Sequence, residues 1–323
     1  MPITAVDVEP ALSSWVGLDG SCVRLINHSE NLIFRIDTPV LGSFVLRVHR
    51  PGYQSRASIE SELAWLMALR RDTTLPISEP IIGRDGALLQ SFETPHGERL
   101  AVLFRFAPGQ EPSPHSDLDD LFRTLGGYAA ELHDHVSAWT PPERFERQVW
   151  QAASILDPDG LWGDWRIAPG VENSHRLVLE ELSDALRGQL KAYGTEADRY
   201  GLIHADMRLG NLLVDGDRVT LIDFDDCGFC WFMFDFAAAI SFHETHAAVP
   251  ALRAAWLEGY LAIRPLSAED IAAMDAMVML RRMALLAWIG SHAETVLAQQ
   301  HTPGFADGTV QLAVRFLRGP IWS

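Results

Sequence analysis

Short apolar runs divide the first hundred residues into segments that favour strands. Runs rich in β-branched and aromatic residues cover 23–26, 32–36 and 43–48, and a further run covers 100–106. Between 59 and 69 the apolar positions instead recur at intervals of three and four residues, which indicates a helix with one buried face. The pattern therefore predicts a small sheet with one helix in the N-terminal third of the chain.

Apolar positions at helical spacing dominate the rest of the chain. They run from Leu118 to Val136, after a start at Ser116 that is similar to a capping box, and again from 270 to 298. In the second run Arg281 and Arg282 occupy polar positions, and charged residues on a helix usually form its solvated side. These patterns predict an α+β fold, with an N-terminal antiparallel sheet plus helix and a larger, mainly helical C-terminal part.

Length and composition predict two lobes. A chain of 323 residues exceeds what one hydrophobic core usually organises, and an apolar content of 48% is enough to build two. The segment Ala107-Pro108-Gly109 follows the last predicted strand and has the composition of a hinge. We therefore expect an N-terminal lobe over 1–107 and a C-terminal lobe over 108–323.

The charge and hydropathy of the chain exclude two classes of partner. A net charge of −17 argues against nucleic acid, because phosphate binding needs a basic surface. The same charge fits a cationic substrate, or solubility alone. The N-terminal residues have neither the basic stretch nor the apolar block of a targeting segment, and charged residues interrupt the most apolar runs too early for a membrane span. We expect a soluble, cytoplasmic protein with no membrane partner.

Two short motifs that are typical of other chemistries lack the rest of their pattern. Cys227 and Cys230 form a CxxC, but a structural zinc site needs two more ligands and a thioredoxin-like motif should open a helix. His243 and His246 stand closer together than the two histidines of the HExxH zinc proteases. We therefore expect the two thiols to be loop residues and predict no zinc site.

The passage around Asp206 carries the clearest chemistry. Asp206 and Asn211 lie five positions apart, and the apolar segments 211–214 and 219–222 then flank Asp-Gly-Asp-Arg, which predicts a β-hairpin that ends at Asp223. A carboxylate such as Asp206 can accept the proton of an incoming hydroxyl, and oxygens of Asn211 and Asp223 suit Mg²⁺. The alternative is that these residues only form a turn and cap a strand, but the combined spacing favours phosphoryl transfer.

The same residues carry a resemblance to a known family. The H-x-D-x-x-x-x-N pattern from His204 and the Ile-Asp-Phe-Asp-Asp stretch resemble the aminoglycoside phosphotransferase and choline kinase-like family, which has a bilobal protein-kinase-like fold. The family includes type II homoserine kinases and bacterial stress response kinases. The resemblance implies ATP and Mg²⁺ as cofactors, Asp206 as the catalytic base, and Asn211 and Asp223 as metal ligands. It also implies that Asp235, with His204, supports the catalytic loop.

The N-terminal lobe supplies the candidates for nucleotide binding. Protein kinases cover the phosphates with a glycine-rich loop, whereas the turn between the first two predicted strands has no glycine, so Ser29 and backbone N–H groups would contact the phosphates. An ordinary hairpin tip is the alternative interpretation of Ser29. The resemblance places adenine against the backbone of residues 104–107, which include Phe104 and Phe106.

One residue departs from the family pattern. Arg47 stands where the family has a lysine that bridges the ATP phosphates and a helix glutamate, and it keeps the charge but binds as a planar fork. Glu62, on the predicted helix, is the expected partner. A purely structural Arg47–Glu62 pair is the alternative.

The sequence restricts the acceptor only to a class. Trp165 and Arg166 lie in a segment rich in Pro, Trp and Gly that forms part of the acceptor pocket in the family, and Arg281 is a candidate if the acceptor carries a carboxylate or phosphate. The alternatives are buried indoles that pin a surface loop and a solvated arginine.

The absence of an Ala-Pro-Glu segment and of a long activation loop favours a small acceptor over a protein. We expect transfer of the γ-phosphate of ATP to a hydroxyl of a small metabolite, such as an amino alcohol, a hydroxy amino acid, a sugar or an aminoglycoside-like compound. A protein Ser/Thr kinase similar to the stress response kinases is one alternative. A nucleotide-binding scaffold with little turnover, which Arg47 motivates, is the other.

Overall fold

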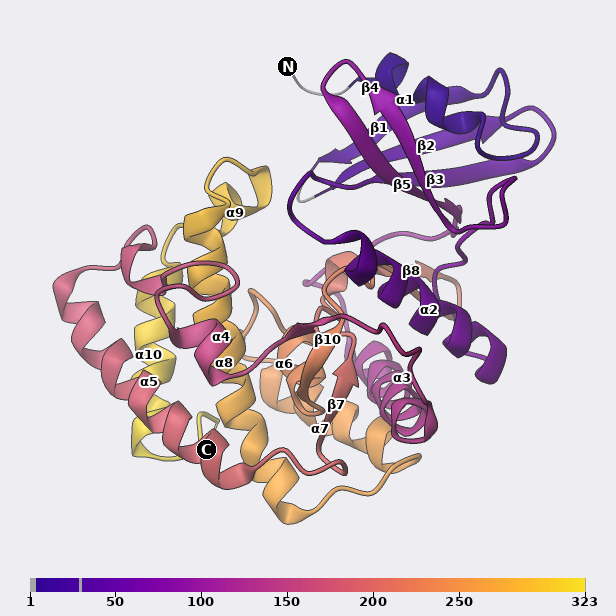
Figure 1. Cartoon of the computed structure of the whole chain (residues 1–323). Coiled ribbons are helices and arrows are strands. Elements are labelled where there is room, and N and C mark those ends of the chain that lie inside the picture. The colour runs from indigo at the N-terminus through magenta and orange to yellow at the C-terminus, as the bar shows by residue number, and fades with distance from the viewer. Residues whose placement is uncertain (1–3, 29–30, 323) are drawn as a thin grey trace. The chain divides into compact units, whose positions relative to one another are not determined.

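The chain forms two compact units. The computed structural model describes residues 4–28 and 31–322 (Figure 1). The first unit contains the described residues up to Gln110 together with Thr140–Arg147 and Leu213–Asp225, and the second contains Glu111–Trp139, Gln148–Leu212 and the residues from Asp226 onward. Two later segments of the chain, one of which carries Asp223, therefore belong to the N-terminal unit.

An antiparallel sheet of five strands forms the body of the first unit. Its strands are β1 (Cys22–His28), β2 (Leu32–Thr38), β3 (Gly42–Val48), β4 (Leu89–Thr94) and β5 (Gly97–Arg105), in the order β1-β2-β3-β5-β4 (Figure 1). Helix α1 (Ala5–Leu12) and Trp15 share a hydrophobic core with Leu46 and Val48 of β3. Because successive side chains of a strand point to opposite faces, Arg47 lies on the face away from this core.

Helix α2 (Arg56–Asp72) carries the glutamate that meets Arg47. Its N-cap is Ser55, whose hydroxyl accepts a hydrogen bond from the backbone N–H of Ser58 at 3.0 Å. Glu62 lies among the buried positions of the helix with Ile59 and Leu66. The apolar spacing that predicts this helix therefore also buries a carboxylate.

A two-stranded hairpin of the first unit precedes the Ile-Asp-Phe-Asp stretch that contains Asp223. Its strands are β8 (Leu212–Asp215) and β9 (Arg218–Leu221), and Gly216 in the turn has a φ of 59°, which glycine adopts at little cost. The backbone N–H of Leu221 donates to the carbonyl of Pro76 at 2.8 Å, which ties β9 to the rest of the unit. The predicted hairpin is therefore present, and Asp223 follows its second strand.

The second unit is mainly helical. Its helices are α3 (Asp119–Ala138), α4 (Ala152–Leu156), α5 (Asn173–Tyr193), α6 (Phe234–Ala239), α7 (Val249–Leu261), α8 (Ala268–Ser291), α9 (Val296–His301) and α10 (Phe305–Arg318), with 3₁₀ turns η1 (Trp165–Ile167) and η2 (Leu209–Asn211). A small sheet has the order β6 (Gln148–Val149), β10 (Gly228–Trp231), β7 (Tyr200–Ile203).

Two glycines allow α3 and α7 to pack closely. A Cβ on Gly126 would lie 1.9 Å from the carbonyl oxygen of Trp256, and one on Gly259 would lie 1.8 Å from that of Arg123. No larger residue fits at either position without separating the helices. This contact fixes α3, which supplies His133 to the centre of the unit.

The structure confirms the predicted α+β fold class and corrects several details. Helix α3 begins at Asp119 with Leu118 as its N-cap and no side-chain cap, so the expected capping box at Ser116 is wrong. The predicted helix 270–298 ends at Ser291, and a separate helix begins at Val296. Among the described residues, no helix combines the length and apolar character needed to cross a membrane.

The expected solvated positions of Arg281 and Arg282 and the expected loop position of Cys230 are also wrong. Arg281 and Arg282 are only 1% and 3% exposed, because α8 is covered on all sides and presents no solvated face at this level. Cys227 and Cys230 are both buried; Cys227 lies in a loop as expected, whereas Cys230 lies in β10.

Candidate active site

Asp206 is held on both of its carboxylate oxygens. It follows β7, and the 3₁₀ turn η2 brings Asn211 back to it, so that Nδ2 of Asn211 donates to Oδ2 of Asp206 at 2.6 Å and to its backbone carbonyl at 2.8 Å. The other oxygen, Oδ1, accepts a hydrogen bond from Nη2 of Arg281 at 2.5 Å. Asp206 is 8% exposed. The carboxylate is therefore fixed in orientation before any substrate binds.

A buried network supports the loop that carries Asp206. Ala205 has a φ of 64°, an uncommon conformation for a residue with a Cβ, and its N–H donates to Oδ1 of Asp235 at 2.7 Å. The second oxygen of Asp235 lies 3.1 Å from Nε2 of His133. His204 is fully buried, and its Nδ1 accepts from the backbone N–H of Asp206 at 3.2 Å. Asp235 and His204 thus accept hydrogen bonds from two consecutive backbone N–H groups of the loop.

Cationic neighbours favour the ionised form of Asp206. Burial raises the pKa of this carboxyl, but the charges of Arg281, Arg208 and His204 and the hydrogen bond from Arg281 outweigh burial and hold the pKa below its usual range. Arg208 contributes a further contact from Nε to Oδ2 at 3.3 Å. The group is therefore a carboxylate at neutral pH, as a proton acceptor must be.

Asp223 lies in a strained and more accessible position. Its φ is 62°, and its side chain is 46% exposed. Its Oδ1 lies 3.5 Å from Nη1 of Arg47. A non-glycine residue is held in this conformation only where the surroundings require it, and such positions cluster at functional sites.

Arg47 and Glu62 form a buried ion pair. Nη2 of Arg47 donates to both oxygens of Glu62, at 2.8 and 2.7 Å, and the two side chains are 4% and 0% exposed. Burial opposes the charge on Arg47, but Glu62, Asp225 and Asp223 raise its pKa above the ordinary arginine value. The guanidinium also lies over the ring of Phe104, with Cζ 5.1 Å from the ring centroid. The expected partners are thus in contact.

Asp225, the second aspartate of the Ile-Asp-Phe-Asp-Asp stretch, connects three segments of the first unit. Oδ2 of Asp225 accepts from Nδ2 of Asn31 at 2.8 Å, and the backbone N–H of Arg50 donates to Oδ1 of Asn31 at 3.3 Å. The backbone carbonyl of Asp225 accepts from Arg147, which also donates to Ser58 at 3.0 Å. Sequence reasoning did not single out Asn31, Asp225 or Arg147, although Asp225 stands within the motif that carries the resemblance. Ser29 lies outside the described residues.

The end of β5 is already partly hydrogen-bonded. The N–H of Phe106 donates to the carbonyl of Ser43 at 3.2 Å, and the N–H of Arg105 donates to Glu79 at 2.9 Å. Phe104 pairs with Val45 within the sheet and is 8% exposed. The backbone N–H groups of Arg105 and Phe106 are therefore engaged within the first unit.

The residues predicted to bind the acceptor have different surroundings. Trp165 is fully buried, and its indole N–H donates to the carbonyl of Leu156 at 3.2 Å. Arg166 pairs with Glu180, with Nε 2.6 Å from Oε1, and its guanidinium stacks over Trp165. Arg281 alone of the three contacts Asp206.

Sequence reasoning missed a buried carboxylate beside this network. Glu244 is 0% exposed; its Oε2 pairs with Nη1 of Arg282, while Oε1 has no hydrogen-bond partner in the part of the chain that the structure describes. Nearby, Phe242 has a φ of 70° and stacks on His301, with ring centroids 4.0 Å apart. The sequence pointed to Glu244 only through its place in the His-Glu-Thr-His run, and that run does not match a zinc motif.

The comparisons with known proteins identify the family. The sequence pattern of the phosphotransferase enzyme family matches residues 23–276, which is more than half of the chain. A solved structure described as the microcompartment-associated aminopropanol kinase is 38% identical, with a TM-score of 0.90 over 99% of each chain.

The chain belongs to the phosphotransferase enzyme family.

More distant relatives are also kinases of small molecules. The amicoumacin kinase of Bacillus subtilis is 24% identical over 68% of this chain, and the match spans 62% of that kinase's own length. The homoserine kinase of Gluconobacter oxydans is 27% identical over 84% of each chain. This phosphotransferase is therefore an ATP-dependent kinase that acts on an alcohol group of a small molecule.

Asn211 of the second unit and Asp223 of the first unit each carry an oxygen of a type that suits Mg²⁺. The described residues contain no group of three or more His, Cys, Asp or Glu side chains that could enclose a metal ion by themselves. Because Nδ2 of Asn211 is engaged by Asp206, the carbonyl oxygen of the amide faces away from the carboxylate. An amide oxygen and the accessible carboxylate of Asp223 are ligands that suit Mg²⁺, which keeps few protein ligands.

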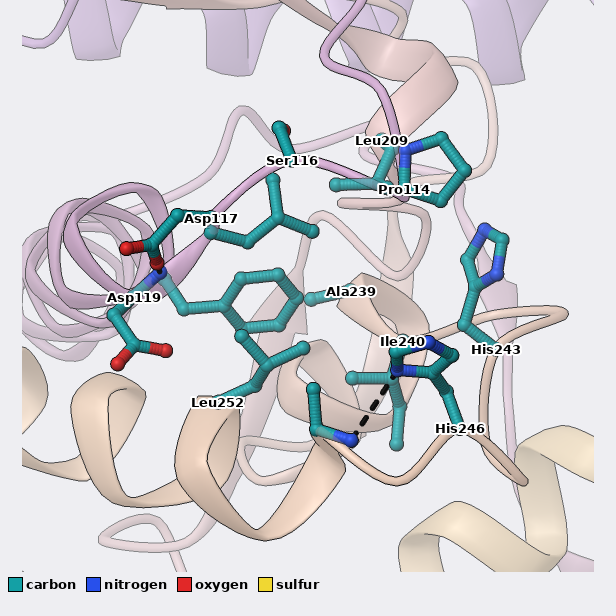
Figure 2. A pocket seen from close by; sticks show the side chains of 13 residues that line it. Pro114, Ser116, Asp117, Asp119, Leu209, Ala239, Ile240, His243, His246 and Leu252 are labelled. Carbon is teal, nitrogen blue, oxygen red and sulfur yellow. Dashed lines mark hydrogen bonds between the residues drawn. The ribbon is translucent and has the colours of Figure 1, made fainter.

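A pocket backs onto the catalytic loop from the side of α3. Its volume is about 110 Å³. Figure 2 shows Leu209 on the same side of the pocket as Ala239 and Ile240, with His243 and His246 beside them. Leu209 lies three residues after Asp206, so this pocket adjoins the loop that carries Asp206.

Proposed function

We propose that this phosphotransferase transfers the γ-phosphate of ATP to the hydroxyl of a small amino alcohol, with Asp206 as the base and Mg²⁺ bound by Asn211 and Asp223. The observation that carries the proposal is the state of Asp206, a buried and ionised carboxylate held by Asn211 and Arg281. Such a group is ready to accept a proton without rearrangement.

The chemical step follows from that placement. The acceptor O–H bond breaks as its proton passes to a carboxylate oxygen of Asp206, and the freed electron pair forms a bond from the acceptor oxygen to the γ-phosphorus. The bond from the γ-phosphorus to the bridging oxygen breaks at the same time, and ADP leaves with that electron pair. Because such transition states require little covalent help, positioning of the hydroxyl supplies most of the protein's contribution.

Each metal ligand has a distinct part in the proposal. When bound, Mg²⁺ neutralises charge on the phosphate oxygens. Asn211 would supply its amide oxygen, since its amide nitrogen orients the base, and Asp223 would supply a carboxylate oxygen. Because Asn211 donates hydrogen bonds to Asp206, the position of the proposed metal ligand and the orientation of the proposed base depend on each other.

Nucleotide binding in the first unit would use Arg47 in the role of the family's lysine. Glu62 engages only Nη2 of Arg47, and Nε has no hydrogen-bond partner within the residues described. The guanidinium therefore retains donors for phosphate oxygens. Phe104 and Phe106 would place adenine through the segment that follows β5, where the N–H of Ala107 donates to no described group.

The surroundings of Glu244 support an acceptor that carries an amine. Its Oε1 is a buried, negatively charged hydrogen-bond acceptor without a partner among the described residues, and an ammonium group would match it in charge. The stacked rings of Phe242 and His301 supply an aromatic wall. Arg281 donates from Nε to Ser241 at 2.9 Å, three residues before Glu244, so the same loop is joined to Asp206 through one side chain. The aminopropanol kinase at 38% identity supports the same class of acceptor.

A coupled assay of ADP release tests the acceptor class. The acceptors are aminopropanol, ethanolamine, homoserine, choline and propanediol, the last of which keeps the hydroxyl but replaces the amine with a second hydroxyl. We expect turnover of aminopropanol and a kcat/KM at least about 100-fold lower for propanediol, because a site built around a charged partner rejects a ligand that leaves it unpaired. Equal kcat/KM values for the two compounds would refute the amine assignment.

A matched pair of variants locates the amine. Glu244→Gln should raise the KM for aminopropanol and leave the KM for ATP unchanged, since the charge that faces the acceptor is lost while the nucleotide contacts remain. Glu258→Gln is the control, because the side chain of Glu258 is largely exposed and pairs with Arg123 on the surface. An equal effect of the two substitutions on the acceptor KM would exclude a role for Glu244.

A further inference from the structure

Arg281 has more hydrogen-bonding capacity than its contacts use. Its side chain is 2% exposed; Nε donates to Ser241 at 2.9 Å and Nη2 to Asp206 at 2.5 Å. Nη1 has no hydrogen-bond partner among the residues that the structure describes. An unsatisfied donor on a buried cation is costly, so native proteins retain such groups where a ligand completes them.

Two aromatic rings lie beside the guanidinium of Arg281. The guanidinium lies over Trp162, with Cζ 5.3 Å from the ring centroid, and 6.0 Å from the ring of Phe234. The rings stabilise the charge but accept no strong hydrogen bond. Because a guanidinium is a rigid planar fork, Nη1 lies beside Nη2 and hence near the carboxylate that Nη2 holds.

The chemistry of the donor restricts its ligand. A guanidinium carries only donors, so it cannot pair with the amine of the acceptor, and it repels an ammonium group. An oxygen that bears negative charge matches it, and the proposed reaction brings such oxygens beside Asp206 when the phosphoryl group reaches the acceptor.

We propose that Arg281 is a catalytic residue whose Nη1 binds an oxygen of the phosphoryl group as it arrives on the acceptor, while Nη2 keeps Asp206 in place. This inference rests on the proposed function, since it assumes that Asp206 marks the position of the acceptor hydroxyl. It assigns to α8 a contact with the transferred group itself. The product complex should therefore depend on Arg281 more than the acceptor complex does.

Isothermal titration of acceptor and product separates this contact from a structural role. The proteins are the parent, Arg281→Met, Arg281→Lys and Arg253→Met, and the ligands are aminopropanol, its phosphate ester and inorganic phosphate, each in the presence of ADP. Arg253 of α7 is the control, because it pairs with Asp275 of α8 at 3.2 Å and, among the described residues, its ion pair and hydrogen bond involve no proposed site residue. Thermal unfolding and ADP titration confirm that each variant is folded.

We expect Arg281→Met to weaken binding of the phosphate ester by about tenfold or more and that of aminopropanol by less than about threefold, since only the ester offers Nη1 an anionic oxygen. Its kcat should fall by about 100-fold, as for loss of one preorganised donor to a developing charge. Arg281→Lys should recover part of both losses, and Arg253→Met should show neither. Equal weakening of ester and aminopropanol, or unchanged ester affinity, would overturn the inference.

The phosphate titration distinguishes a failure of this inference from a failure of the proposed function. If the parent binds neither aminopropanol nor its ester, the proposed acceptor is wrong, and weaker binding of inorganic phosphate by Arg281→Met still supports the contact. If the parent phosphorylates aminopropanol but Arg281→Met binds ester and phosphate as the parent does, only the inference on Arg281 fails.

Discussion

His49 should make the stability of the protein sensitive to mild acid. It directly follows β3, and its backbone N–H donates to the carbonyl of Leu100 at 2.9 Å. The side chain is 5% exposed, and neither ring nitrogen has a hydrogen-bond partner among the residues described. Burial first, and then the charges of Arg47 and Arg147 against the opposing charge of Asp225, lower the pKa of His49 to about 3. The folded protein therefore holds this ring neutral.

The sign and size of the effect follow from linkage. A histidine whose pKa is lowered on folding stabilises the protein above its unfolded pKa of 6.5, and this stability is lost as pH falls from 6.5 toward 3. One pKa unit corresponds to about 1.4 kcal/mol, so His49 should reduce the free energy of unfolding by about 2 kcal/mol between pH 7 and pH 5. The unfolded chain gains a proton over this range that the folded chain does not bind.

Urea unfolding followed by tryptophan fluorescence near pH 7 and pH 5 measures this loss. His49→Gln removes the titrating ring, so the variant should lose about 2 kcal/mol less than the parent over this interval, while other histidines contribute equally to both. The control is His96→Gln, because His96 is exposed. The same pH dependence in the parent and in His49→Gln would refute the reasoning.

Three further predictions concern catalysis and nucleotide binding. Asp206→Asn should lower kcat by about 10² to 10⁴-fold and leave ATP affinity intact by isothermal titration; an equal loss of nucleotide affinity would contradict its role as base. Asp223→Ala should weaken Mg²⁺-dependent nucleotide binding more than Asn211→Ala does, and nucleotide binding that needs no metal in the parent would exclude both as ligands. Arg47→Ala and Glu62→Ala should each lower ATP turnover, the second less, and the double variant should be little worse than Arg47→Ala; additive losses would show that the two act independently.

The sequence predicted the parts of the site that depend on neighbouring residues. The spacing of Asp206 and Asn211 indicates a turn, and the Asp-Gly-Asp-Arg segment between two apolar runs indicates the hairpin, because turn chemistry and strand alternation are local properties. Both features are present in the structure. The Arg47–Glu62 contact could also be predicted from the sequence, since the strand and the helix that carry these residues have clear periodicity.

Contacts between distant segments could not be predicted from local sequence patterns. The partner of Asp206 on α8 lies 75 residues away, and the contact from Asn31 to Asp225 spans 194 residues. The rule that charged residues mark the solvated side of a helix fails on α8, because Asp206 and Glu244 supply buried partners for its two arginines. Local pattern does not reveal a helix that is covered on every side.

The adjacency of Arg281 and Arg282 separates two properties that evolution can change independently. Successive residues of a helix point about 100° apart, so one arginine reaches Asp206 and the next reaches Glu244. On the roles proposed above, substitutions around Arg282 and Glu244 would change which compound the enzyme accepts, while Arg281 would keep its contact with Asp206. A shift of one residue in the register of α8 would instead turn one arginine into the direction of the other and leave Asp206 or Glu244 without its arginine partner. Diversification within the family should therefore alter side chains on this helix and preserve its length up to these positions.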